Sequence, residues 1–405
     1  MEGKMKMNMK KILALICALA MMLLVFAGCQ SSGKDEGGDA EGETAQVEET
    51  AGVPLENIKV GVIHIGDPAT GSGYSYTHDQ GIVAMQKELG LSDEQIVRKN
   101  NIDDSDATAI ENAMRECVEE GCNIIFATSW GYMDTCEALA EEYPDVFFSH
   151  GTGYKSNGTN FNNYFGRIYQ ARYLSGIAAG LKTQTGKIGY VSAQGVENGE
   201  CTSGIDAFAM GVASVNPDAV VEVKITNSWY DPEGEGQAAQ ALIDDGCDVI
   251  AQHCDTNNPQ IVARDNGVWG VGYNSDMTSE VGDSVLTSVV WNWGAYYTAA
   301  VKNVMDGTWT VGQNVENYYG SMADGLCNIT DLSAEAAEGT QDAVNVAAAA
   351  IIDGSFDVFT GTYTDAEGNM IGCDGAMETN DGSVIEVDGT NYAAITAYYK
   401  NVVVK

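Results

Sequence analysis

Positively charged residues are scarce in this chain. Its 405 residues include 20 Lys and Arg against 58 Asp and Glu, so the formal net charge is −38. A surface of this sign repels a phosphate backbone, and we therefore expect no nucleic acid partner. It also offers no attraction to anionic lipid headgroups. The excess of acid is typical of solubility outside a cell, and it does not determine the fold.

Motifs for metal, nucleotide and hydrolytic chemistry are also missing. The chain has no C-x-x-C pair, H-E-x-x-H motif, EF-hand loop or G-x-S-x-G elbow, so metal centres and serine hydrolases receive no support. It lacks a P-loop lysine and the glycine spacing of dinucleotide sites, which argues against nucleotide-phosphate binding. We expect no metal, no cofactor and no enzymatic activity. An extracellular hydrolase that uses a carboxylate pair stays open as a minor alternative.

The first 29 residues have the layout of an export signal. Four lysines precede an apolar run at residues 12–26, and Ala27, Gly28 and Cys29 follow it. A small-residue cleavage site after such a run marks a secretory signal. The ending Gly-Cys resembles the bacterial lipoprotein signal, with Phe26 where that family has Leu. The resemblance implies cleavage after residue 28 and acylation of Cys29, which would hold the protein on the extracytoplasmic face of the cell membrane.

The alternative for this segment is an uncleaved anchor, but the run of 15 residues is short for a span that needs roughly 20. Residues 29–56 begin with the cysteine and continue as an acidic segment with almost no large apolar side chains. Such a composition cannot bury enough surface to order itself, so we expect a flexible tether. The remaining 350 or so residues exceed what one hydrophobic core usually serves, and two lobes are expected.

Eight cysteines follow Cys29, and an even number in an exported protein permits disulfides. Several of them lie on or beside apolar helix faces and strand starts, where cysteine behaves as a small core residue. We expect at most one or two bridges. The eight are Cys117, Cys122, Cys136, Cys201, Cys247, Cys254, Cys327 and Cys373.

Short apolar strands alternate with amphipathic helices along the chain, which predicts α/β lobes with parallel sheets covered on both faces. We expect strands at residues 58–65, 123–127, 146–149, 187–191, 219–225, 248–251 and 268–272. We expect helices at residues 77–89, 106–120, 133–142, 199–213, 234–245 and 258–266, and a further helix at 334–352. Strands are also expected at 357–364 and 391–404, in a tail that extends a sheet edge. In such lobes, ligands bind at the carboxyl ends of the strands, here in a cleft between two lobes.

The segments that follow the predicted strands are rich in aromatic and hydrogen-bonding side chains. Four of the six tryptophans lie there. Rings stack on flat ligands, and Asp or Asn fixes their orientation through N–H groups. The pattern suits a flat, polar, uncharged heterocycle, although saccharides also bind on aromatic faces. His78, His253 and Cys254 are expected to have structural roles, since no metal-ligand spacing surrounds them. The candidate ligand-binding residues are Asp67, Tyr74, Tyr76, Trp130, Trp229, Asp255, Asp276 and Trp293.

Residues 163–181 resemble the F-x-x-x-Q-A-x-Y-L-x-G-x-x-A-A helix of the basic membrane lipoprotein (BMP-type) family, the substrate-binding proteins of ABC importers. Residues 128–133, 272–277 and 292–294 are similar to that family as well. The resemblance implies a type I periplasmic-binding fold, in which three crossovers form a hinge between two doubly wound lobes. It implies a monomer whose partners are a permease and an ATPase. The implied lobes are residues 57–184 with 288–322, and residues 185–287 with 323–405.

Characterised members of that family mostly bind purine nucleosides, and residues 73–78 are similar to a branch associated with free purine bases, with Tyr74 in place of Trp. The resemblance therefore implies a purine base or nucleoside. It implies that Tyr74, Trp130, Trp229 and Trp293 contact the purine, while Asp67, Asp255 and Asp276 accept its N–H groups. A sugar or signal-molecule binder or sensor of the same fold is the alternative.

Overall fold

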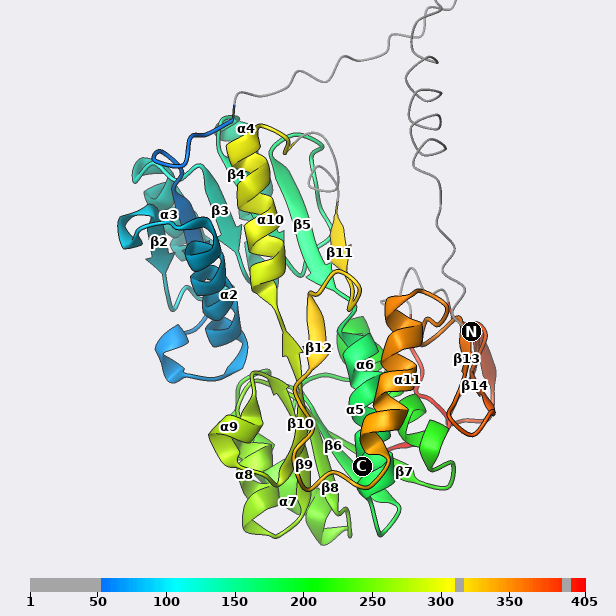
Figure 1. Ribbon diagram of the computed structural model, residues 1–405. Coiled ribbons are helices and arrows are strands. Elements are labelled where there is room, and N and C mark those ends of the chain that lie inside the picture. The colour runs from blue at the N-terminus through cyan, green and yellow to red at the C-terminus, as the bar shows by residue number, and fades with distance from the viewer. Residues whose placement is uncertain (1–51, 310–316, 388–394) are drawn as a thin grey trace, which may run out of the picture. The chain divides into compact units, whose positions relative to one another are not determined.

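Two separate sheets, each covered by helices, organise the protein in the computed structural model (Figure 1). The structure describes residues 52–309, 317–387 and 395–405. The predicted export signal, Cys29 and most of the predicted linker lie outside the described residues. Within them, residues from 52 onward belong to a single unit that contains both sheets.

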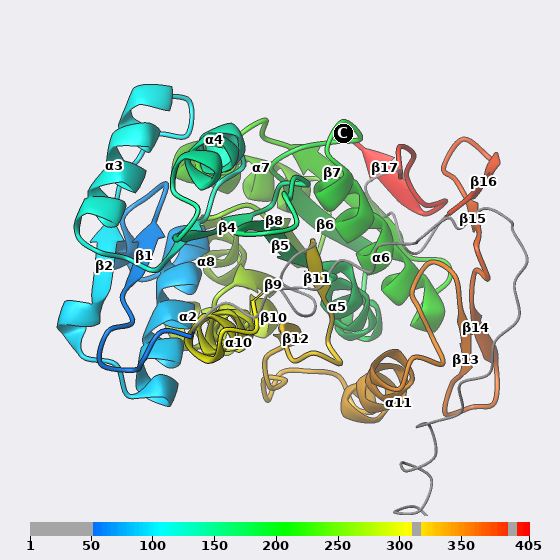
Figure 2. The same cartoon turned by 90° about the horizontal axis from the view of Figure 1, so that it is seen from above.

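The first sheet has the strand order β11-β5-β4-β3-β1-β2, and all its pairings are parallel. Its strands are β1 (Val60–Ile63), β2 (Ile96–Lys99), β3 (Ile124–Ala127), β4 (Phe147–Gly151), β5 (Phe161–Gly166) and β11 (Tyr318–Gly320). Strands β1 (VGVI) and β3 (IIFA) are buried along their whole length, as strands covered on both faces must be. The covering helices are α2 (Gly73–Leu89), α3 (Ala107–Glu119), α4 (Met133–Glu142) and α10 (Trp293–Asp306). Figure 2 shows α2 and α10 on one face of this sheet and α3 and α4 on the other.

The second sheet has the order β12-β10-β9-β8-β6-β7-β17, in which only β12 runs antiparallel to its neighbour among the described strands. Its strands are β6 (Lys187–Ser192), β7 (Val220–Ile225), β8 (Val249–His253), β9 (Trp269–Asn274), β10 (Val285–Trp291), β12 (Cys327–Ile329) and β17 (Val402–Val404). Helices α5 (Ile168–Lys182), α6 (Gly199–Val215), α7 (Pro232–Asp244), α8 (Asn258–Asp265) and α9 (Met277–Val281) accompany it. Figure 1 shows the two sheets as upper and lower lobes of this unit.

Three connections join the lobes and form the expected hinge. They are the passages from β5 to α5, from β10 to α10, and from β11 to β12. The three connections meet at Gly166, because a Cβ at this position would lie 2.5 Å from Leu326 Cδ2 and 2.9 Å from the Trp291 ring. The Trp291 ring stacks on Trp293 with centroids 4.4 Å apart, so the hinge has a tightly packed aromatic centre.

Two of the expected lobe boundaries differ from the structure. Helix α5 packs on α6 in the second lobe, so the chain crosses near Arg167 and not after residue 184. The cause is the close approach of two helix backbones, since a Cβ on Gly176 would lie 2.1 Å from the Phe208 carbonyl oxygen. Strand β10 continues to Trp291 as a member of the second sheet, so the return crossing follows that residue instead of residue 287.

The family-like segment 163–181 is not helical throughout. Its first residues belong to β5, and α5 begins at Ile168. Strand β5 carries polar side chains that mask its strand character in the sequence. Asn162 donates from Nδ2 to the Tyr296 hydroxyl and Asn163 donates from Nδ2 to the His150 carbonyl oxygen, and both asparagines are buried. These bonds satisfy polar groups that an apolar pattern would not contain.

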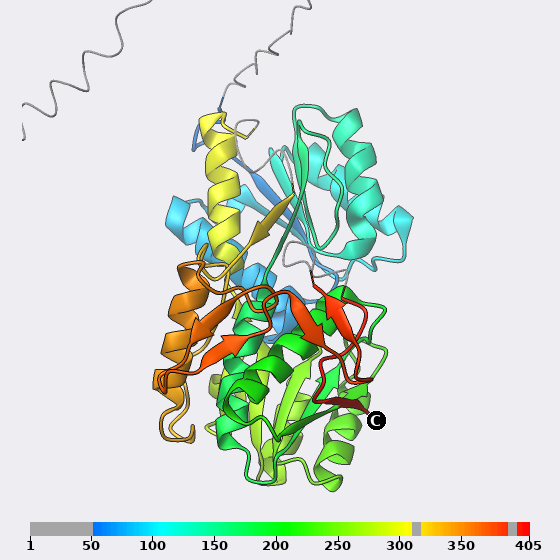
Figure 3. The ribbon, with the colours of Figure 1, turned by 90° about the vertical axis from the view of Figure 1, so that its right-hand side faces the viewer.

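The tail beyond residue 329 packs on the second lobe. Helix α11 (Thr340–Ile352) contacts α5, and two hairpins follow, β13 (Thr362–Thr364) with β14 (Met370–Gly372) and β15 (Ala376–Glu378) with β16 (Val384–Glu386). Figure 3 shows them in orange and red, in front of the green elements. Strand β17 then pairs in parallel with β7, so the predicted edge extension is confirmed, although the strand is shorter than residues 391–404. Among the described helices, none combines the length and apolarity needed to cross a bilayer.

All eight cysteines after Cys29 are free thiols in the structure, and all but Cys373 are buried. This is consistent with the expectation of few bridges. Burial in apolar surroundings disfavours the thiolate, and it raises the pKa of Cys247 to about 12. We predict that protein lacking residues 1–29, denatured without reductant, titrates as eight thiols per chain with a disulfide-exchange reagent, because no pair is bridged. A count of six or fewer would contradict the arrangement, and a reduced sample provides the reference value.

Candidate ligand-binding cleft

A cavity of about 740 Å³ lies between the carboxyl ends of the two sheets. This volume is within the usual range of small-molecule sites, roughly 300–1,000 Å³. Loops that follow strands of both sheets supply its walls, as the topology requires. The lining residues are Ile65, Tyr74, Asp104, Ser129, Trp130, Thr152, Gly153, Tyr154, Phe165, Gln194, Glu197, Asn198, Gly199, Glu200, Trp229, Asp255 and Tyr273.

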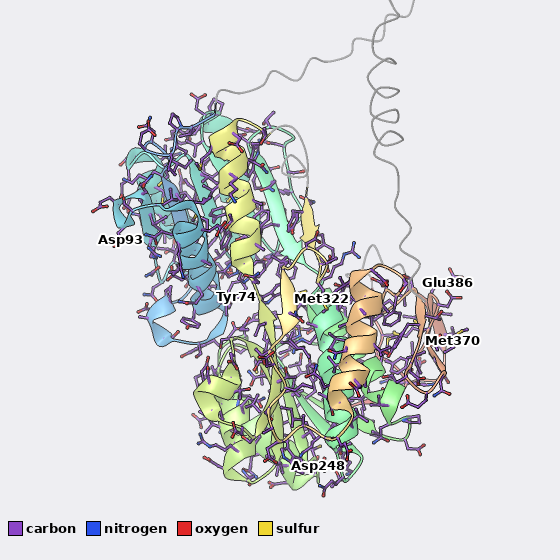
Figure 4. All side chains as sticks on the ribbon, viewed as in Figure 1. Tyr74, Asp93, Asp248, Met322, Met370 and Glu386 are labelled. Carbon is purple, nitrogen blue, oxygen red and sulfur yellow. The ribbon has the colours of Figure 1, made fainter. Side chains whose placement is uncertain are left out.

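Four of the eight candidate residues line this cavity. Tyr74 and Trp130 reach it from the first lobe, and Trp229 and Asp255 reach it from the second. The Asp255 amide donates to the Trp229 carbonyl oxygen, so these two second-lobe residues hold each other in place. Figure 4 shows Tyr74 at the lower end of α2, between the two lobes. The structure thus brings four separate strand-end segments to one space.

The other four candidates do not line the cavity, and the reasons are structural. Asp67 and Asp276 act as N-caps, since each accepts a backbone N–H two residues along, from Ala69 and Thr278 respectively. Tyr76 is half-buried on α2 and is absent from the cavity wall.

Trp293 is fully buried in the first lobe, where its ring stacks on His78 and on Trp291 with both centroid distances at 4.4 Å. A tryptophan directly after a strand can therefore belong to the core instead of the site. His78 donates to or accepts from the Tyr297 hydroxyl at 2.5 Å, which agrees with the structural role expected for it.

Six aromatic rings contribute to the cavity wall among the described residues. Trp130 and Tyr154 stand at the rim, 57% and 62% exposed, with ring centroids 6.0 Å apart. Phe165 and Tyr273 are buried. Exposed aromatic rings beside a cavity are a costly use of apolar surface unless a ligand covers them. The exposed rings of Trp130 and Tyr154 therefore leave apolar surface at the rim that a ligand could cover.

Carboxylates provide most of the charge in the wall. They are Asp104, Glu197, Glu200 and Asp255, and no lysine, arginine or histidine lines the cavity in the described chain. Burial raises the pKa of Glu200 to about 7 and that of Asp255 to about 8. With these pKa values, near neutral pH the two groups can donate when protonated or accept when ionised, and no cationic side chain of the described wall would neutralise an anion.

Sequence reasoning did not single out several lining residues. Glu200 lies in the first turn of α6, where an acidic residue is explained equally well by the helix dipole. Asp104 belongs to the run of acids before α3, a pattern typical of a solvated loop. Tyr273 directly follows the expected strand 268–272 but belongs to β9 in the structure, and it was not among the candidate residues. No simple local signal separates these residues from others, since Asp67 and Asp276 are the first acidic residues after β1 and β9 and cap helices instead.

One contact joins the lobes directly, away from the hinge connections. A Cβ placed on Gly73, at the start of α2, would lie 2.5 Å from the Asp255 carbonyl oxygen in the second lobe. Gly73 has φ +82°, and Gly71, two residues earlier, has φ +80° with open space around it. The two glycines therefore have the same backbone requirement, but only one has a neighbour in the other lobe.

We predict that Gly73→Ala lowers the free energy of unfolding by about 1–3 kcal/mol more than Gly71→Ala does, because only the former forces the lobes apart. Both variants carry the strain of a left-handed alanine, so their difference isolates the contact between lobes. Urea unfolding of the ligand-free protein measures it. Equal destabilisation by the two substitutions would show that the lobes do not meet here in solution.

Comparison with known proteins identifies relatives along most of the chain. The model of the Bmp family, described as ABC transporter substrate-binding protein PnrA-like, matches residues 58–353. The chain is 38% identical over 320 residues to a purine-binding protein of Brucella abortus (strain 2308), which covers 78% of this chain and 86% of the relative. It is 33% identical over 333 residues to a putative ABC transporter glucose-binding protein of Haloferax volcanii, with 82% and 78% covered.

The solved structure of an ABC transporter solute-binding protein from Conexibacter woesei has a similar fold, with a TM-score of 0.61 at 18% identity over 74% of this chain and 98% of the other. The expected type I periplasmic-binding fold is confirmed. A protein of this class takes a small-molecule ligand and works with transporter subunits. By the span of the family match and the identity to its relatives, the chain belongs to the Bmp, PnrA-like family of ABC transporter substrate-binding proteins.

Proposed function

We propose that the cleft binds a purine base or nucleoside and that the protein delivers it to the permease and ATPase of an importer. The observation that supports this most is the composition of the cavity wall, in which six rings surround several carboxylates without a cation. Purines are flat and carry N–H groups along their edges, so they offer faces to rings and donors to carboxylates. The purine-binding relative from Brucella abortus supports the same ligand class.

Phosphorylated ligands fit this cavity poorly. A nucleotide would bring at least two negative charges toward Asp104, Glu200 and Asp255, and no lysine or arginine of the described chain lines the cavity to offset them. A neutral base or nucleoside avoids that repulsion. The ligand class is therefore limited to forms without phosphate.

Closure of the lobes would complete the site. Trp130 belongs to the first lobe and Trp229 to the second, and both line the cavity. Bending at the hinge connections would bring the two rings toward opposite faces of a flat ligand. Each stacked ring contributes about 0.5–1.5 kcal/mol beyond the burial of area. A ligand enclosed between the closed lobes would also be released only when the transporter reopens the cleft.

A sugar is the second candidate ligand. The relative from Haloferax volcanii is named as a putative glucose-binding protein, and aromatic faces also bind saccharides. Against this, the buried Arg172 does not line the cavity, and a guanidinium that clamps ring hydroxyls is the usual feature of sugar sites in this fold. A signal molecule presented to a sensor partner would use the same cleft.

We also propose that Cys29 carries the lipid that anchors the protein outside the cell membrane. Single acyl chains bind membranes only marginally, so a stable anchor needs more than one chain. The Gly-Cys ending of the signal supports this, because the new N-terminal cysteine can take both a diacylglycerol and an N-acyl chain. An anchored binder stays at high local concentration beside its transporter.

We predict that Trp130→Ala weakens binding of the preferred purine at least about tenfold, because the variant loses one face of the stack. Isothermal titration of protein lacking residues 1–55 with adenine, guanine, hypoxanthine, adenosine, guanosine and glucose measures this. Tyr230→Ala is the matched control, since this ring is 64% exposed beside Trp229 and is absent from the cavity wall. We expect its dissociation constant to match the wild-type value.

The same titration separates the alternatives. Saturation by a base or nucleoside supports the proposal. Binding of glucose alone would show that the ligand is a sugar instead. Release of a cleaved product from a nucleoside would indicate a hydrolase. An unchanged dissociation constant for Trp130→Ala would contradict the place given to this ring.

We predict that Cys29→Ser abolishes labelling with radioactive palmitate and leaves an unprocessed precursor when the full chain is made in a bacterium that processes lipoproteins. The hydroxyl cannot form the thioether that the lipid requires. Cys17→Ser is the control, because it changes the same residue type within the same signal. Label retained in Cys29→Ser, or lost in both variants, would argue against acylation at Cys29.

A further inference from the structure

Glu200 lies in the second-lobe wall of the cavity with only one of its two oxygens engaged. Its Oε1 atom is 3.3 Å from His253 Nε2 and 3.5 Å from the Tyr273 hydroxyl. In its ionised form the carboxylate can only accept, and both neighbours then donate to it. The Tyr273 hydroxyl in turn accepts from Trp291 Nε1 at 3.2 Å. The carboxylate is therefore oriented by a fixed network, and within the described residues its Oε2 atom has no hydrogen-bond partner.

Asp255, in the segment that follows β8, has a similar arrangement. Its Oδ1 atom accepts a hydrogen bond of 2.8 Å from Asn274 Nδ2. Asn274 is held in a left-handed backbone conformation with φ +68°, which directs its side chain from the end of β9. No described residue donates to Oδ2 of Asp255. Each of the two acids thus has one oxygen held by the protein and one oxygen left for a ligand.

The protein supplies little positive charge to offset these two acids. Neither forms an ion pair with a lysine or arginine in the described part of the chain, and the ring of His253 is buried, with a pKa well below its ordinary value. Arg172 lies behind the Tyr273 ring, with its guanidinium 4.1 Å from the ring centroid, and it donates from Nη1 to the Gln252 carbonyl oxygen. Both acids are only partly buried at the cavity wall, so their unengaged oxygens are open to a ligand that donates to them.

We infer that Glu200 is a specificity-determining residue, which together with Asp255 selects purines that carry an exocyclic amine over the same ring without one. This inference rests on the proposed function and specifies which purines the cleft prefers. An amine supplies two N–H donors beside those of the ring, so it satisfies the unengaged carboxylate oxygens that a bare ring leaves unpaired. Donation by the amine favours the ionised form of each acid, and hydrogen bonds to a charged acceptor are the stronger ones.

Tyr74 supplies the complementary group from the first lobe. Its hydroxyl is buried and has no hydrogen-bond partner in the described chain, although the ring lines the cavity. The negative charges of Glu200 and Asp255 both raise the pKa of this hydroxyl, which adds to the larger effect of its burial. A neutral hydroxyl can donate to a ring nitrogen of the ligand. The ligand edge would then meet acceptors from one lobe and a donor from the other.

Two ligand pairs test the selection, because the members of each differ only by an amine. They are adenine against unsubstituted purine, and guanine against hypoxanthine. We expect wild-type protein to bind the amine-bearing member at least about tenfold more tightly in titration calorimetry. Glu200→Gln should reduce that preference to about threefold or less, chiefly by weakening the amine-bearing ligand. The preference is the ratio of the two dissociation constants within a ligand pair. Its change between wild-type protein and Glu200→Gln isolates the interaction of Glu200 with the amine.

Glu233→Gln is the control, since this exposed residue on α7 undergoes the same chemical change away from the cavity, and we expect it to keep the wild-type preference. If Glu200→Gln does not fold, as judged by its thermal transition, Glu200→Met removes the charge with an apolar side chain of similar length. Equal weakening of both members of a pair would overturn the role of Glu200 while leaving purine binding intact. Failure of the four bases, and of adenosine and guanosine titrated beside them, to bind wild-type protein would overturn the proposed function, and this inference with it.

Discussion

The packing of Gly166 against Trp291 and Leu326 is the contact on which the arrangement of the lobes depends. It brings the end of β5, the end of β10 and the connection before β12 to one point, where no side chain larger than hydrogen fits. A contact this close leaves no space at this point for the lobes to slide past one another. Because the carboxyl ends of both sheets face each other there, the hinge determines which loops form the cleft.

The cleft combines two kinds of surface that are unfavourable in water. Trp130 and Tyr154 are apolar rings left exposed at the rim, and Glu200 and Asp255 are carboxylates placed in a partly dry wall without ion pairs to lysine or arginine in the described chain. Both conditions are relieved by the same kind of molecule, a flat ring with N–H groups at its edge.

The sequence allowed the fold to be predicted in most respects, because buried parallel strands such as β1 and β3 are continuous apolar runs between helices. Strand β5 was missed because its asparagines are satisfied by partners distant in the chain, which no local pattern reveals. Of the eight candidate residues for the site, four line the cavity. Tyr74, Trp130, Trp229 and Asp255 follow strands and line the cavity, whereas Asp67 and Asp276 follow strands and cap helices. Trp293 shows the same ambiguity, since the direction of a side chain after a strand depends on the packing of the whole lobe.

The order in which the chain emerges during biosynthesis has a consequence for this fold. The first lobe takes α10 and β11 from residues 293–320, and the second sheet takes its edge strand β17 from residues 402–404. Neither lobe can therefore be completed until the last quarter of the chain is available. Folding of both lobes therefore finishes only when synthesis of the chain is almost complete, and until then each lobe lacks part of its native contacts.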